Sequence, residues 1–250
     1  MTLVRMILDY TLPLICIMGV GVIAAYLFKK PINRALPAGI LGSVLIVYVL
    51  GFIDLRVGLW CIGLGVLVLV AMFVRRILSH KIDAKEISVW IKSNIVGEYL
   101  IAFLMLYTFF FVLNYNKLFY KWDDYSHWGM MAKECFRINR YYFLPDSMLS
   151  VHPEYPPFTT LCGYIWCKLC GYYKEQHLYN ARLVIISVCM LSSLSVLFEK
   201  KEKVRIGERR FDRNSIVRIA FAVLMTISLA LLPSLYDAAI FRTLYPEGVM

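Results

Sequence analysis

Charged residues are scarce in this sequence. Lys, Arg, Asp and Glu make up 18% of the 250 residues, whereas hydrophobic residues make up 60%. An ordinary soluble domain is about a quarter charged and about half apolar. The composition therefore argues against a water-soluble domain and indicates a protein that crosses a membrane several times.

The sequence also lacks a cleavable signal peptide and a complete zinc-binding motif. No small-residue cleavage site separates the first apolar stretch from Lys29 and Lys30, which favours a retained first span. The seven cysteines include one CxxC, formed by Cys167 and Cys170, with Cys162 just upstream. Because there is no second CxxC and no flanking histidine at zinc spacing, we assign no metal ligands and expect packed thiols, with a metal or redox site as the weaker alternative.

Several apolar stretches are long enough to cross a bilayer, which takes about 20 residues. They cover residues 8–28, 36–53, 57–74, 95–114, 178–198 and 215–235. We therefore predict an all-α, polytopic membrane protein with about six transmembrane helices. The stretch 159–172 is short and contains Gly163 and Lys168, so we expect it to lie at the interface or re-enter rather than cross.

Basic residues gather in the loops after the first, third and fifth apolar stretches. They are Lys29, Lys30 and Arg34; then Arg75, Arg76, Lys81, Lys85 and Lys92; then Lys200, Lys201, Lys203, Arg205, Arg209, Arg210 and Arg213. If the spans alternate, all three loops lie on one side, which the positive-inside rule makes cytoplasmic. This orientation accounts for the net charge of +10, and we expect no nucleic-acid partner.

The loop at residues 115–177 is then extracytoplasmic, and it concentrates the polar chemistry. Asp123 and Asp124 follow the fourth span at the level of the lipid headgroups. Neighbouring helix residues diverge by about 100°, so one carboxylate can face a site while the other is held by a donor. If a helix begins there, His127 lies one turn from Asp123, and the two could act as a general base and phosphate-binding pair. The alternative is an acidic helix N-terminus without catalytic function.

From Trp128 the residues have the spacing of an amphipathic helix that lies in the membrane plane. Its apolar face carries Trp128, Met131, Ala132, Cys135 and Phe136, and its polar face carries Lys133, Glu134, Arg137 and Arg140. The cations either bind anionic lipid or offer donors to a phosphate.

A turn follows at residues 152–157. Pro156 and Pro157 fix an extended backbone and prevent a helix from continuing. The turn either leads only into the next helix or also positions His152 and Glu154 against the two acids.

The order of these motifs resembles the first outer loop of GT-C glycosyltransferases, most closely the protein O-mannosyltransferase branch. The resemblance covers residues 119–161. It is carried by Trp122-Asp123-Asp124, His127-Trp128-Gly129, the basic helix, the aromatic cluster at residues 141–143 and the turn from His152 to Pro157. This chain has Asp where that branch has Glu, one extra residue before His127, and Glu154-Tyr155 inside the turn. These departures argue against a protein mannosyltransferase and favour a bacterial transferase.

The resemblance implies an enzyme of the bacterial plasma membrane that transfers a sugar from a polyprenyl-phosphate donor to an extracytoplasmic glycan, lipid or protein. It implies that Asp123 is the general base and that Asp124 occupies the second acidic position. The residues expected to bind substrate and phosphate are His127, Lys133, Arg137, Arg140, His152 and Glu154. No cofactor is required by this resemblance, although a divalent metal ion stays open. The expected partners are the lipid-linked sugar and membrane lipid.

The chain is predicted to have two parts. Residues 1–94 hold three spans and a cytoplasmic linker, and residues 95–250 hold a GT-C-like catalytic portion. Because GT-C enzymes have more spans after this loop, we expect the second part to be incomplete at its C-terminus, with Asp237 and Glu247 as further outer acids. The alternatives are a non-catalytic scaffold or a transporter subunit, which Glu98 inside the fourth span would favour.

Overall fold

The computed structural model describes residues 3–79, 84–119, 122, 124–149, 154–195 and 213–231. These residues form nine α-helices and one π-helical turn, with no strand among them, so the all-α prediction is confirmed for the described part of the chain. The elements are α1 (Leu3–Phe28), α2 (Ile32–Leu50), α3 (Leu55–Leu78), α4 (Ala84–Asn94), α5 (Glu98–Leu113), η1 (Asp124–Trp128), α6 (Gly129–Ile138), α7 (Phe158–Cys170), α8 (Glu175–Ser193) and α9 (Arg213–Leu231).

Three helices are long and apolar enough to cross a membrane, namely α1, α2 and the Leu55–Met72 part of α3. α4 and α5 would form a fourth span if the pair, which bends by 64°, crosses as one. The apolar part of α9 (Asn214–Ala230) is shorter, and α8 does not qualify. The three to four candidate spans support an integral membrane protein, but they do not confirm the predicted six.

The reason that α8 does not qualify is its polar first half. Gln176, His177, Asn180 and Arg182 lie there, and all four are buried at 5% exposure or less. α8 packs against α7, α5, α2 and α9, so protein rather than lipid surrounds these side chains. The sequence predicted a lipid-crossing helix from residue 178, but it did not reveal that other helices surround the first half of this helix.

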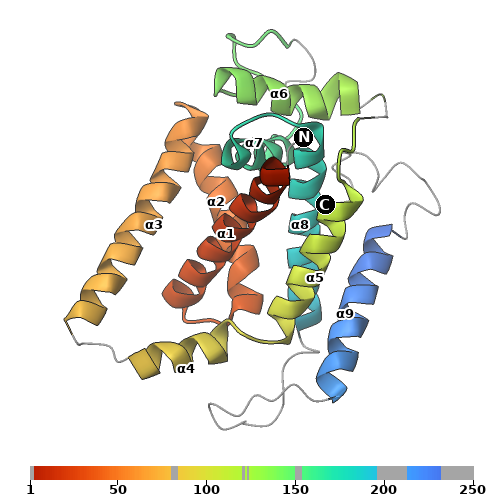
Figure 1. Cartoon of the computed structure of the whole chain (residues 1–250). Coiled ribbons are helices and arrows are strands. Elements are labelled where there is room, and N and C mark those ends of the chain that lie inside the picture. Colours follow the sequence, from red (N-terminus) through yellow and green to blue (C-terminus); the bar gives the residue numbers. More distant parts are fainter. Residues whose placement is uncertain are drawn as a thin grey trace.

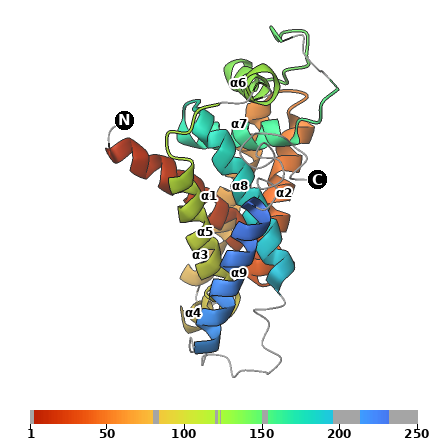
Figure 2. The same cartoon turned by 90° about the vertical axis from the view of Figure 1, so that its right-hand side faces the viewer.

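The long helices run back and forth along one bundle (Figure 1). The π turn, α6 and α7 gather at one end, where α6 lies across the bundle, as Figure 2 also shows. The α1–α2 connection, α4 and the start of α9 lie at the opposite end. A cavity of about 360 Å³ between α1 and α4, lined by Tyr26 and Trp90 among others, lies at that opposite end.

This arrangement separates the two kinds of loop that the sequence distinguishes. The described basic residues Lys29, Lys30, Lys85 and Lys92 belong to the end that holds the α1–α2 connection and α4. The elements of the predicted outer loop belong to the other end. Which end faces the cytoplasm stays a prediction.

The predicted amphipathic helix forms as α6. Its apolar face packs inward, with Met131, Ala132 and Cys135 at 1% exposure or less, while Lys133 and Arg137 are exposed. α6 contacts α7 and η1. The predicted division into two faces is therefore correct, except at Glu134.

Glu134 was expected on the polar face but is 8% exposed. Its carboxylate accepts hydrogen bonds from Arg137 Nε at 2.8 Å and Arg137 Nη2 at 2.6 Å. It also accepts one from the backbone N–H of Met148 at 2.9 Å. These donors compensate the burial of a charge and tie α6 to the loop that follows it.

α7 does not match a transmembrane span. It has 13 residues, fewer than a bilayer requires, which agrees with the prediction that this stretch does not cross. Gly163 lets α7 approach α8 closely, because a Cβ at this position would lie 2.8 Å from Leu178 Cγ.

Candidate functional site

The predicted acidic motif enters α6 through a single π-helical turn, η1. Such turns occur frequently at functional sites. Gly129 follows the turn, and a Cβ there would meet the Phe119 ring and the Asp124 backbone oxygen at less than 3.0 Å. Only glycine therefore fits where the chain arriving from α5 crosses the start of α6.

Asp124 is completely buried. Its Oδ2 accepts a hydrogen bond from the Tyr179 hydroxyl of α8 at 2.7 Å. Lys117 Nζ lies 3.7 Å from the centroid of the Tyr179 ring. Tyr179 thus contacts a cation through its ring face and a carboxylate through its hydroxyl, which fixes the orientation of Asp124.

The loop that leads from α5 to the π turn is attached to the beginning of α8. Asn114 Nδ2 donates to Asn180 Oδ1 at 3.0 Å. The backbone N–H of Asn116 donates to Gln176 Oε1 at 2.9 Å. The polar half of α8 is therefore the scaffold on which the acidic motif is held.

Two motifs that are separate in the sequence meet at Tyr155. Its ring stacks on Trp128, with centroids 4.9 Å apart and an interplanar angle of 16°. The His127 ring centroid lies 6.0 Å from the Tyr155 centroid, and the Tyr142 hydroxyl donates to the Tyr155 carbonyl at 2.6 Å. The His-Trp-Gly segment, the aromatic cluster and the Pro-Pro turn thus form one assembly.

The two arginines predicted to bind phosphate are engaged by carboxylates. Arg137 forms its paired contacts with Glu134, and Arg140 forms an ion pair with Asp146. Glu134 holds the pKa of Arg137 above its ordinary value, and Arg137 in turn lowers the pKa of Glu134. A phosphate would have to compete with these partners.

The remaining described candidates lie around the same end. Lys133 is exposed, with Nζ 6.0 Å from the Tyr173 ring centroid. His127 is half-buried, and its Nδ1 contacts Ser126 Oγ at 2.5 Å. Glu154 is exposed at the turn.

Four predicted residues lie outside the described residues: Asp123, His152, Asp237 and Glu247. Their roles stay predictions.

Glu98, the residue that favoured a transporter, is half of an ion pair. Arg218 of α9 donates to its carboxylate from Nε at 2.8 Å and from Nη2 at 2.5 Å. The pair joins α5 to α9. The transporter alternative stays a prediction.

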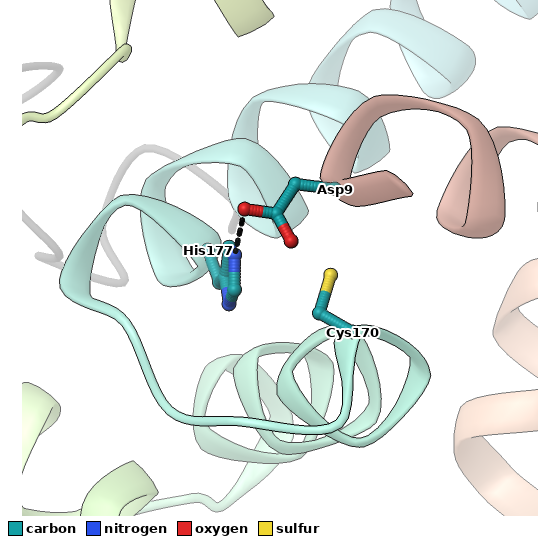
Figure 3. Close-up of side chains that lie close together, drawn as sticks. All are labelled: Asp9, Cys170 and His177. Atoms are coloured by element: carbon teal, nitrogen blue, oxygen red, sulfur yellow. Dashed lines mark ion pairs between the residues drawn. The ribbon is translucent and has the colours of Figure 1, made fainter. Parts of the chain in front are cut away.

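Sequence reasoning missed a buried cluster where α1 meets the α7–α8 connection. Asp9, Cys170 and His177 lie together there, with Asp9 Oδ2 3.6 Å from His177 Nε2 (Figure 3). The Tyr172 hydroxyl donates to the Asp9 carboxylate. Asp9 was the available signal, because an ionisable residue inside an apolar span marks a candidate functional position.

Comparisons of this chain with known protein families, curated proteins and solved structures gave no match.

Proposed function

We propose that this protein is a GT-C-type membrane glycosyltransferase that moves a sugar from a polyprenyl-phosphate carrier to an acceptor on the extracytoplasmic face. One observation carries the proposal. The acidic motif with Asp124, the His-Trp-Gly segment and the turn with Tyr155 lie at one end of the bundle, away from the basic connections. The sequence resemblance joins the same three motifs in one catalytic loop.

The reaction needs a base for the acceptor hydroxyl and a partner for the departing phosphate. We assign the base to Asp123, because the Asp124 carboxylate is already engaged by the Tyr179 hydroxyl inside the core. The acceptor proton passes to the base as the acceptor oxygen bonds to the anomeric carbon. The bond from that carbon to the phosphate oxygen breaks, and the polyprenyl phosphate leaves with the electron pair.

Asp124 is then a positioning residue. Its buried hydrogen bond to Tyr179 would hold the π turn at the height at which the neighbouring acid acts. The Trp128–Tyr155 stack supplies an aromatic surface of the kind that lines ligand sites. Among the three predicted cations Lys133, Arg137 and Arg140 we assign the phosphate to Lys133, because Arg137 and Arg140 are engaged by acids.

The test measures transfer of label from a panel of polyprenyl-phosphate hexoses and pentoses in membranes that contain the full chain. Asp123→Asn should lower transfer by about 100-fold or more, which is the usual contribution of a general base. The matched control is Asp54→Asn. Asp54 forms an ion pair with Arg56 and is not part of the assigned site. It lies in the connection between α2 and α3, which a hydrogen bond from the Leu55 N–H to the Asn139 carbonyl attaches to the end of α6. Transfer that is unchanged in Asp123→Asn would remove the base assignment.

Tyr179→Phe separates positioning from structure. We expect lower transfer with an unchanged amount of protein in the membrane, because the substitution removes only the hydroxyl that holds Asp124. If wild-type membranes transfer no sugar from any donor, the scaffold alternative is favoured instead.

A further inference from the structure

The cluster at the junction of α1, α7 and α8 offers three different donor groups. Asp9 contributes a carboxylate, Cys170 a thiol and His177 an imidazole, and all three residues are buried. Their candidate ligand atoms lie within 4.8 Å of one another, and Figure 3 shows the side chains gathered around a common point. We propose that Asp9, Cys170 and His177 bind a zinc ion.

The first support is an imidazole without hydrogen-bond partners. His177 is completely buried, and neither ring nitrogen makes a hydrogen bond to the described residues. Its contact with Asp9, at 3.6 Å, is longer than a hydrogen bond, and Asp9 Oδ1 also has no hydrogen-bond partner there. Leaving such a buried group unsatisfied destabilises the folded state. A metal ion bound between these atoms would use their lone pairs.

The second support is the chemistry of the donors. Zinc accepts sulfur, nitrogen and oxygen ligands in tetrahedral geometry, whereas magnesium and calcium prefer oxygen alone. Bonds of about 2.0–2.3 Å place tetrahedral ligand atoms roughly 3.3–3.8 Å apart. The separation of 3.6 Å between Asp9 Oδ2 and His177 Nε2 already fits this range. All three ligand atoms lie within 4.8 Å of one another, so the remaining pairs have to close by at most about 1 Å.

Two neighbours orient the carboxylate. Tyr172 donates to Asp9, and Arg5 Nε lies 3.6 Å from Asp9 Oδ1. Residues around metal ligands commonly fix their orientation in this way. Three protein ligands leave the fourth zinc position for water or another small ligand. The ion would join α1 to the α7–α8 connection, more than 160 residues away in the chain.

The experiment uses the full chain purified in detergent without chelators. We expect about one zinc ion per chain, since the cluster forms one site. After chelator treatment, added Co²⁺ should give a thiolate-to-cobalt charge-transfer band, and Zn²⁺ should abolish it. Cys170→Ser should lose the band. Cys167→Ser, which alters another buried cysteine on the same helix, should keep it.

The measurements on wild-type protein test the zinc proposal even if a variant fails to fold. Protein that is purified without zinc and gives no thiolate band with Co²⁺ overturns the proposal. A band that persists in Cys170→Ser overturns it as well. Neither measurement depends on sugar transfer, so the result is independent of the function proposed above.

Discussion

Gly129 illustrates how single residues determine the geometry of the acidic motif. Its missing side chain leaves room for the Phe119 ring and the Asp124 backbone oxygen. Its carbonyl accepts a hydrogen bond from the Tyr173 hydroxyl at 3.1 Å. The start of α6 is therefore fixed both by close packing and by a polar contact.

Gly129→Ala should destabilise the protein by about 1–3 kcal/mol, because an added methyl group has no space at this position. The control is Gly63→Ala in α3, where nothing lies within 4 Å of an added Cβ. That substitution should be neutral or stabilise the helix by up to about 1 kcal/mol. Thermal unfolding in detergent measures both, and equal midpoints for the two variants would contradict the packing argument.

At the same scale, the sequence identified Asp124 but not its partner. Two adjacent acids directly after an apolar span indicate a candidate site from the sequence alone. Tyr179 is one of 17 tyrosines, and nothing in its neighbourhood predicts contact with a residue 55 positions away. Glu134 was misassigned for a similar reason, since its burial depends on a donor from Met148, beyond the helix.

At the scale of elements, the charged Glu134 carboxylate attaches α6 to the loop that follows it. The Arg137 guanidinium and the Met148 amide keep the pKa of Glu134 below its usual range. α6 is also attached by apolar packing, through Met131 and Cys135. The contribution of Glu134 should therefore be visible as a dependence of stability on pH.

Because the pKa of Glu134 is lowered on folding, its stabilisation is present above the ordinary value of 4.5 and is lost as the pH falls through the folded value. Glu134→Gln should cost about 1–2 kcal/mol at neutral pH and remove part of the acid sensitivity. Unfolding midpoints between pH 3 and pH 7 (roughly the range in which carboxylates titrate) measure this. Glu86→Gln, at an exposed position of α4, should leave the profile unchanged.

The Glu98–Arg218 pair should couple α5 to α9. In a double-mutant cycle with Glu98→Gln and Arg218→Gln, we expect a coupling of about 1–3 kcal/mol, because Glu98 is 10% exposed. The exposed Asp54–Arg56 pair is the comparison and should give less than about 1 kcal/mol. Similar coupling in the two cycles would show that burial does not strengthen the Glu98 contact.

The helices themselves were largely predictable, and their surroundings were not. Apolar length alone marks α1, α2 and α3. α8 is different, because its polar residues are matched by Asn114 and by the loop before η1, which lie far away in the sequence. Hydrophobicity therefore locates the helix but does not reveal which of its residues face protein.

At the scale of the whole molecule, the two ends of the bundle differ in chemistry. One end holds the acidic motif and the aromatic stack, together with cations of α6 and α7 such as Lys133 and Lys168, and the other holds the basic connections with Lys29, Lys30, Lys85 and Lys92. Exposed apolar side chains such as Trp60, Leu64 and Leu67 lie on α3 between the ends. This division predicts that the two ends lie on opposite sides of a membrane.

Cysteine labelling checks the orientation in a background without the exposed Cys16 and Cys61. Met148→Cys, at a position 84% exposed beyond α6, should react with an impermeant maleimide on intact cells. Ser79→Cys, at the end of α3, should react only after permeabilisation. The opposite pattern would place the acidic motif in the cytoplasm and end the proposed transfer reaction.

The buried polar half of α8 has a consequence for biogenesis. A segment with His177, Asn180 and Arg182 is costly to release into lipid by itself, since one central arginine adds about 2.5–3.5 kcal/mol. Because α8 does not qualify as a span by itself, we expect it to join the membrane only after the helices that pack around it. Glycosylation mapping would then find α8 outside the bilayer when α1 and α2 are deleted, and integration that is unaffected by the deletion would refute this order of assembly.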